Sequence, residues 1–131
     1  MSDRLYLIVS AGRPLEAKAA MLHAPASPDL CVRSPSPEAQ LAADVAFSGR
    51  YVRTIEEPLL ARRRTGESLG DFTWRCADAL RNLYALDTRF AFVVVDELHT
   101  VEKNVLLLDE QSLLHIAEGL ERSAVNAGAA A

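Results

Sequence analysis

The sequence predicts an α/β fold of three layers, α/β/α, in which a mostly parallel sheet lies between two layers of helices. Two apolar runs, residues 5–9 and 90–95, show no polar–apolar alternation, as expected of strands buried on both faces. Segments with helical periodicity alternate with short strand-like runs, which is typical of such a sheet. The 131 residues are the length of one domain. We expect a single domain over residues 1–123 and a frayed tail over residues 124–131.

Composition excludes several classes of protein. The net charge of −4 and the pI of about 5.3 speak against an electrostatic nucleic-acid binder. Cys31 and Cys76 lack metal-ligand spacing, so we expect free thiols, no metal and no cofactor. The apolar run before Ser10 is too short for a signal-peptide core, and no later run approaches a membrane span. We therefore expect a cytoplasmic protein without membrane partners.

The first half of the chain predicts strands and helices in alternation. The segments are a strand at residues 5–9, a helix at 14–22, a strand at 29–33, a helix at 38–47 and an edge strand at 50–55. Pro14 and Pro37 occupy plausible first positions of the two helices, and Ser36 is a candidate N-cap. The apolar faces are expected to be Leu15, Ala19 and Leu22 in the first helix, and Leu41, Val45 and the alanines in the second.

The second half begins with a long polar stretch, residues 56–69, which we interpret as a loop with one helical turn at 59–63. A helix capped by Asp71 follows, with Arg75, Asp78 and Arg81 on its outward face and with these residues inward: Phe72, Cys76, Leu80 and Leu83. The central strand at residues 90–95 comes next. The last elements are a strand at 105–108 and a helix at 110–122, capped by Asp109.

Four segments, taken in order, resemble motifs of the histidine phosphatase superfamily. Residues 5–12 resemble the family's first strand and its R-H-G tip, and residues 32–42 (VRSPSPEAQLA) resemble its S-P-x-x-R-A-x-x-T-A element. Residues 60–70 resemble L-x-E-x-x-x-G-E-x-x-G, with matches at Leu60, Gly66, Glu67 and Gly70, and residues 90–98 resemble the strand before a second S-H-G. The resemblance implies a phosphoglycerate mutase-like fold. It is truncated, because the connection over residues 12–29 is shorter than is usual in the family.

The resemblance also implies a chemistry that this chain has lost. In the family, the first motif's His becomes phosphorylated, two arginines and a second His hold the phosphoryl oxygens, and a carboxylic acid protonates the leaving group. The first Arg falls on Ser10, the nucleophilic His on Ala11, the second Arg on Glu38, the acid on Arg62 and the second His on Glu97. All five positions differ. Ala11 cannot carry a phosphoryl group, and Glu38 and Glu97 would repel one. We therefore expect no catalytic residues of the family's kind and no phosphatase or mutase activity.

Two functions remain open. In the first, the protein is a catalytically inactive binding or scaffolding module. In the second, an acidic cleft performs acid–base chemistry on a substrate without phosphate, as in a biosynthetic pathway. The ligand-binding candidates are Ser10, Glu38, Arg62, Asp96, Glu97 and His99. The partner would be a small molecule or a protein, and a homodimer is the expected assembly.

Each candidate also has an interpretation without function. The helix dipole favours Glu38 in a first helical turn, Asp96 and Glu97 could be solvated acids, and Arg62 could belong to a solvated charge run. His99 could be a base, a metal ligand or neither, and no spacing motif supports a Ser10–His99 pair oriented by Asp96. An unpaired, desolvated carboxylate in an open pocket would favour the enzyme, whereas an arginine between the glutamates would favour the binding module.

Overall fold

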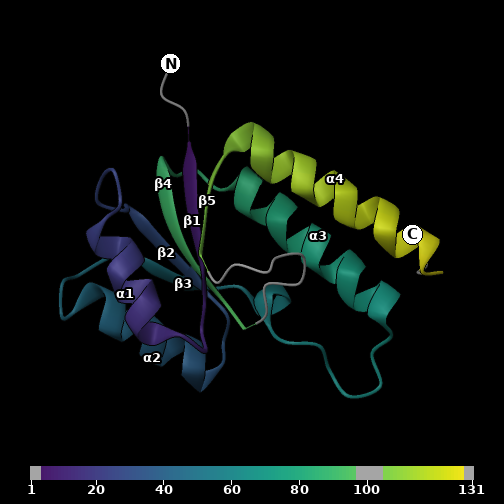
Figure 1. Ribbon diagram of the computed structural model, residues 1–131, viewed down its shortest axis with the longest axis horizontal. Helices are drawn as coiled ribbons and strands as arrows, with labels where there is room; N and C mark the ends of the chain where they lie inside the picture. Colours follow the sequence, from purple (N-terminus) through teal and green to yellow (C-terminus); the bar gives the residue numbers. More distant parts are fainter. Residues whose placement is uncertain (1–3, 97–104, 129–131) are drawn as a thin grey trace.

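The computed structural model describes residues 4–96 and 105–128 (Figure 1). In chain order the elements are β1 (Leu5–Ser10), α1 (Pro14–Leu22), β2 (Leu30–Arg33), α2 (Pro37–Phe47), β3 (Thr54–Glu56), the 3-10 helix η1 (Pro58–Leu60), α3 (Leu69–Ala85), β4 (Phe90–Val95), β5 (Val105–Asp109) and α4 (Glu110–Asn126). None of the helices in these described ranges has both the length and the hydropathy that a membrane-spanning helix requires.

The strands form one mostly parallel sheet in the order β3-β2-β4-β1-β5. The strand β4 is central, lies parallel to β1 and β2, and pairs with β1 from Leu5 opposite Phe90 to Ser10 opposite Val95. Among the strands of the described residues, β5 alone is antiparallel to its neighbour, β1. The two continuous apolar runs of the sequence, β1 and β4, are therefore neighbouring strands. Their carboxyl ends lie at the same edge, where the Ala11 N–H donates to the Val95 carbonyl at 2.8 Å.

Helices cover both faces of the sheet. The helices α1 and α2 lie on one face, and α3 and α4 pack together on the other (Figure 1). Strand side chains alternate between the two layers, so Leu7 and Val9 pack toward α1 and α2 while Tyr6 and Ile8 pack toward α3 and α4. Burial on both faces explains why the strand sequences are continuously apolar. The three-layer α/β/α prediction is confirmed.

The predicted inner face of α1 is wrong, and that of α2 is confirmed for the alanines but wrong for Leu41. Leu15 is 76% exposed and Leu22 69% exposed, whereas the buried residues of α1 are Ala17 and Met21. In α2, Leu41 is exposed, and the buried residues are Ala39, Ala42, Ala43, Ala46 and Phe47. The two helices pack against each other and against the sheet through alanines. Small side chains permit this close approach, and the leucines are left toward solvent.

Several boundaries also differ from prediction. The strand β3 covers Thr54–Glu56 and not all of residues 50–55, although it is the predicted edge strand. The helical turn lies at Pro58–Leu60, one residue earlier than expected. Ser68 caps α3 by accepting from the Asp71 N–H at 3.0 Å, so Asp71 is a first-turn residue and not the cap.

The helix α4 continues beyond the predicted end at residue 122. It reaches Asn126, three residues into the segment expected to be a tail. Ala124 is fully buried, and this burial explains the extension. The predicted caps Ser36 of α2 and Asp109 of α4 are confirmed.

Candidate functional site

The Asp96 carboxylate lies at the carboxyl edge of the sheet and joins three segments of the chain. Its Oδ2 accepts hydrogen bonds from the Ser34 hydroxyl at 2.7 Å and from the Arg62 backbone N–H at 3.2 Å. Its Oδ1 accepts from the Ser36 hydroxyl at 2.5 Å. The Asp96 N–H in turn donates to the Leu60 carbonyl at 3.3 Å. These contacts tie the end of β4 to the β2–α2 connection and to the loop after η1.

The two serines are positioned by the start of α2. Ser34 follows β2 directly and is fully buried. Ser36 is the N-cap of α2, and its hydroxyl oxygen also accepts from the Ala39 N–H at 3.1 Å. Asp96 therefore places its negative charge at the N-terminus of a helix, where the helix dipole stabilises an anion. Its oxygens already accept from the donors that the serines offer.

Glu38 and Arg62 are brought together beside this cluster. Glu38 lies in the first turn of α2, and its Oε2 is 3.7 Å from Nη2 of Arg62. Their side chains are 57% and 59% exposed, so this ion pair contributes at most about 1 kcal/mol. Glu97 and His99, the other predicted members of the site, lie outside the described residues.

The tip of β1 supplies Ser10 and Ala11. Ala11 is buried in the core on the α1 and α2 side, and its N–H is bound to β4. The Ser10 carbonyl accepts from the Arg13 N–H at 3.2 Å. The Arg13 side chain pairs with Glu16 at 3.3 Å. No side chain at this tip can form a phosphohistidine.

A buried arginine that the sequence analysis placed outward holds the loop after η1. Arg75 is only 8% exposed, and its guanidinium donates to both Glu67 carboxylate oxygens at 2.8 and 2.9 Å. It also donates to the carbonyls of Leu59, Ala61 and Arg62 at 2.8–3.0 Å. Hydrogen bonds from Arg75 lower the pKa of Glu67 to about 2. Arg75 thus fixes the backbone segment whose Arg62 N–H reaches Asp96.

The sequence contains signals for the contacts of Arg75, Ser34 and Ser36 that the motif comparison did not predict. Arg75 lies three residues after Phe72 and four before Ala79, both buried, so helical spacing places it on the inward face. Glu67, one of the matches to the family motif, is its partner. The serines Ser34 and Ser36 follow a strand next to β4, and parallel strands bring their carboxyl ends to one edge.

The described residues contain no group of three or more His, Cys, Asp or Glu side chains that could hold a metal ion. The hydrogen bonds described above make the cluster around Asp96 a hydrogen-bonded carboxylate beside the exposed ion pair of Glu38 and Arg62. Of the predicted candidates, the structure brings Asp96, Glu38 and Arg62 to the same edge as Ser10 and Ala11.

Comparison with known proteins identifies the fold. No protein-family model matches the sequence, and no curated protein matches it significantly. Among solved structures, the chain is similar to phosphoglycerate mutase from Plasmodium falciparum, with a TM-score of 0.58 over 86% of this chain and 87% of that one. The chain has a phosphoglycerate mutase-like fold. The two sequences are 12% identical, so the similarity establishes the fold and not the activity.

Proposed function

We propose that this protein uses a phosphoglycerate mutase-like fold as a binding or scaffolding module and does not transfer phosphoryl groups. The observation that carries the proposal is Ala11. The resemblance to the histidine phosphatase motifs places the nucleophilic His at this position, next to the end of the central strand β4. A methyl group cannot form the covalent intermediate, and the neighbouring Ser10 offers a hydroxyl where an arginine would be needed.

The charges at the edge support the same proposal. Phosphoryl transfer requires concentrated positive charge around the transferring oxygens. Glu38 stands where the resemblance implies a phosphate-binding arginine, and it pairs with Arg62 at 3.7 Å. The Asp96 carboxylate is a further negative charge, and it already accepts from Ser34, Ser36 and the Arg62 N–H. A bound phosphate would be repelled by the two carboxylates, and the nearby donors already form hydrogen bonds with Asp96.

The alternative, an enzyme with other acid–base chemistry, has less support from the described residues. Such a reaction needs a desolvated carboxylate free to exchange a proton. Glu38 is more than half exposed and paired, and Asp96 accepts three hydrogen bonds. The proposed partner is accordingly one that contacts a polar surface with exposed acids, and it undergoes no reaction there.

An NMR titration of the protein with inorganic phosphate tests the proposal. We expect no saturable change in the backbone amide signals of residues 10–12 or of Ser34, Ser36, Glu38 and Ala39. The matched variant is Arg62→Gln, which removes the arginine that pairs with Glu38. Saturable phosphate binding to the wild type at these residues, lost in Arg62→Gln, would show a working anion site and overturn the proposal.

A further inference from the structure

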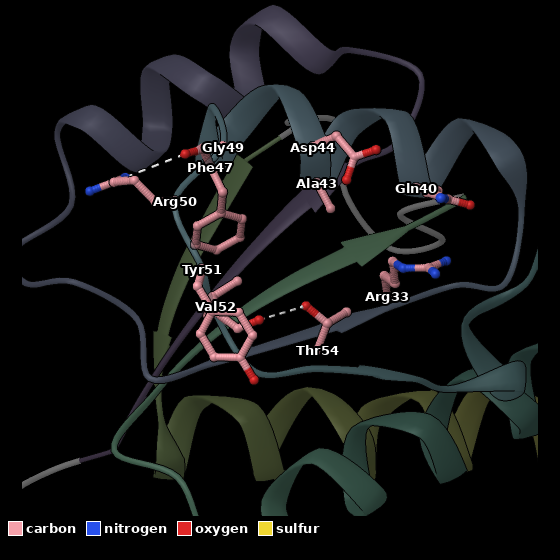
Figure 2. Close-up of a pocket in the computed structure, with 10 residues that line it drawn as sticks. All are labelled: Arg33, Gln40, Ala43, Asp44, Phe47, Gly49, Arg50, Tyr51, Val52 and Thr54. Atoms are coloured by element: carbon pink, nitrogen blue, oxygen red, sulfur yellow. Dashed lines mark hydrogen bonds between the residues drawn. The ribbon is translucent and has the colours of Figure 1, made fainter.

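A groove lies between α2 and the edge strand β3. Its volume is about 520 Å³, within the range of small-molecule sites. It is lined by α2, by the chain from Gly49 to Thr54, and by Arg33 at the end of β2 (Figure 2). None of Ser10, Ala11, Glu38, Arg62 and Asp96 belongs to this lining, so the groove is distinct from the cluster around Asp96.

One end of the groove is mainly apolar and aromatic, with Arg50 beside it donating from its Nε to the Phe47 carbonyl at 3.4 Å (Figure 2). The Phe47 ring is buried and held edge-on to Phe92, with 5.3 Å between the ring centroids. Val52 packs against the same core. Tyr51 is 93% exposed, and its ring stands near Phe47 at this end (Figure 2). An aromatic side chain so exposed, beside a hollow with a buried aromatic wall, offers a contact surface for an apolar group.

The other end carries opposite charges on two elements. Asp44 and Gln40 belong to α2, and Arg33 lies across from them at the end of β2 (Figure 2). The Arg33 side chain is 14% exposed and is held by Glu56 at 3.1 Å and by the Ser34 carbonyl at 3.2 Å. Asp44 and Arg33 do not pair with each other, and the Asp44 carboxylate has no ion-pair or hydrogen-bond partner among the described residues.

The helix dipole of α2 does not favour a carboxylate at the position of Asp44. It lies in the last turn of α2, where the helix dipole disfavours a carboxylate. Its charge also adds to the burial that raises the pKa of the Cys31 thiol to about 11, whereas Arg33 acts in the opposite direction. Both side chains line the groove, which lies on the side of the sheet that α2 covers. They leave a space between an acid and an anchored cation.

We propose that this groove binds a free α-amino acid with an apolar or aromatic side chain. Arg33 receives the carboxylate, Asp44 receives the ammonium group, and the side chain lies against Phe47, Val52 and Tyr51. Each charge of the ligand meets the opposite charge of the protein, which a ligand carrying a single charge cannot achieve. The inference concerns a different site from the proposed function and does not depend on it.

The probe is L-phenylalanine, with two analogues that each lack one charged group. 3-Phenylpropionate lacks the ammonium group, and phenethylamine lacks the carboxylate. In an NMR titration we expect phenylalanine to give saturable shifts at the amides of Ala43, Asp44 and residues 51–54. Each analogue should bind about tenfold more weakly, the effect of losing one hydrogen bond to a charged group.

The variant Asp44→Asn and the control Glu118→Gln separate the proposal from general surface effects. Asp44→Asn keeps the shape of an exposed side chain and should weaken phenylalanine about tenfold while leaving 3-phenylpropionate unchanged. Glu118 lies on α4, on the opposite face, and Glu118→Gln should change neither. The proposal is wrong if phenylalanine gives no saturable shifts at the groove. It is also wrong if Asp44→Asn binds phenylalanine as the wild type does, or if either analogue matches phenylalanine.

Discussion

At the scale of single residues, the Asp96 side chain connects three segments of the chain at the carboxyl edge of the sheet. Its three acceptor contacts join β4, the start of α2 and the loop that carries Arg62. Ser34 is fully buried, so its hydroxyl would have no replacement partner if the carboxylate were removed. Asp96 thus acts as a structural hydrogen-bond acceptor. The interpretation of Asp96 as a solvated acid is wrong, because its carboxylate accepts three hydrogen bonds within the protein.

We predict that Asp96→Ala lowers the free energy of unfolding by about 2–4 kcal/mol, because it leaves the buried Ser34 hydroxyl without its acceptor and removes the hydrogen bonds from Ser36 and the Arg62 N–H. Asp96→Asn retains one acceptor oxygen and should lose less. Urea unfolding at neutral pH measures both. A loss below about 0.5 kcal/mol for Asp96→Ala would mean that the hydroxyls find other partners.

Tyr6 differs from Asp96 in that its polar group forms no hydrogen bond within the described residues. Its ring is fully buried in the core between the sheet and the α3–α4 layer, and its hydroxyl has no hydrogen-bond partner among the described residues. Burial raises the pKa of this phenol. We predict that Tyr6→Phe is at least as stable as the wild type, by up to about 1–2 kcal/mol in thermal or chemical unfolding, because an unsatisfied buried hydroxyl is removed. A clear loss of stability would reveal a partner for the hydroxyl.

At the scale of elements, the ion pair between Glu67 and Arg75 fixes the loop between η1 and α3. The side chains are 13% and 9% exposed, and Arg75 also satisfies three loop carbonyls. A segment that the sequence presents as a polar loop is therefore held by one helix side chain. By fixing this loop, Arg75 positions the Arg62 N–H that donates to Asp96.

We predict that Glu67→Gln lowers stability at neutral pH by about 2–4 kcal/mol, because a largely buried arginine loses its counter-ion. The folded-state pKa of Glu67 is about 2, below the ordinary value of 4.5. The contribution of this carboxylate is therefore complete above pH 4.5 and is lost as the pH falls toward 2.

Unfolding measured from neutral to acidic pH should show the difference between wild type and Glu67→Gln shrinking over that interval. The exposed pair of Arg81 and Glu121 is the matched control, and Glu121→Gln should cost less than about 1 kcal/mol. A wild-type to Glu67→Gln difference that stays constant from neutral pH to below pH 3 would contradict the assignment of the pKa shift to this pair.

The elements that could be predicted from sequence are those with local signals. Continuous apolar runs identified β1 and β4, and Ser36 and Asp109 marked the starts of α2 and α4. Helix faces were less predictable. Leucine spacing suggested one face of α1, but alanine packing against α2 selected another. Such a choice depends on the neighbouring helix, which periodicity within one helix does not contain.

At the scale of the whole molecule, the sheet topology brings together candidate residues that are distant in the sequence. The parallel sheet places Ser10, Ala11 and Asp96 at one edge, and the ion pair joins Glu38 to Arg62. The roles of Ser34, Ser36 and Arg75 could not be predicted from motif positions, because they arise from hydrogen bonds between segments that are separate in the sequence. Ser34 and Ser36 lie 62 and 60 residues from Asp96, and Arg75 lies 16 residues from Leu59.

Assembly also belongs to this scale. Leu15 and Leu22 are exposed on α1, and Leu107 of β5 is half exposed opposite Leu7, on the same side of the sheet as α1. We predict a homodimer, because a second copy could cover these leucines. Light scattering should give the mass of two subunits. A mass of one subunit across a broad concentration range would contradict this.

The most direct test of the proposed loss of phosphoryl transfer is turnover of an aryl phosphate and of phosphoglycerate. We predict none for the wild type and none for Ala11→His, because Ser10 and Glu38 still stand where the resemblance requires arginines. Removing one oxyanion-stabilising donor can cost about 10²–10³ in rate, and here several groups are absent together. Ala11 is buried, so the fold of Ala11→His is checked by circular dichroism. Wild-type turnover that survives repurification and disappears in Glu38→Ala would contradict the proposal.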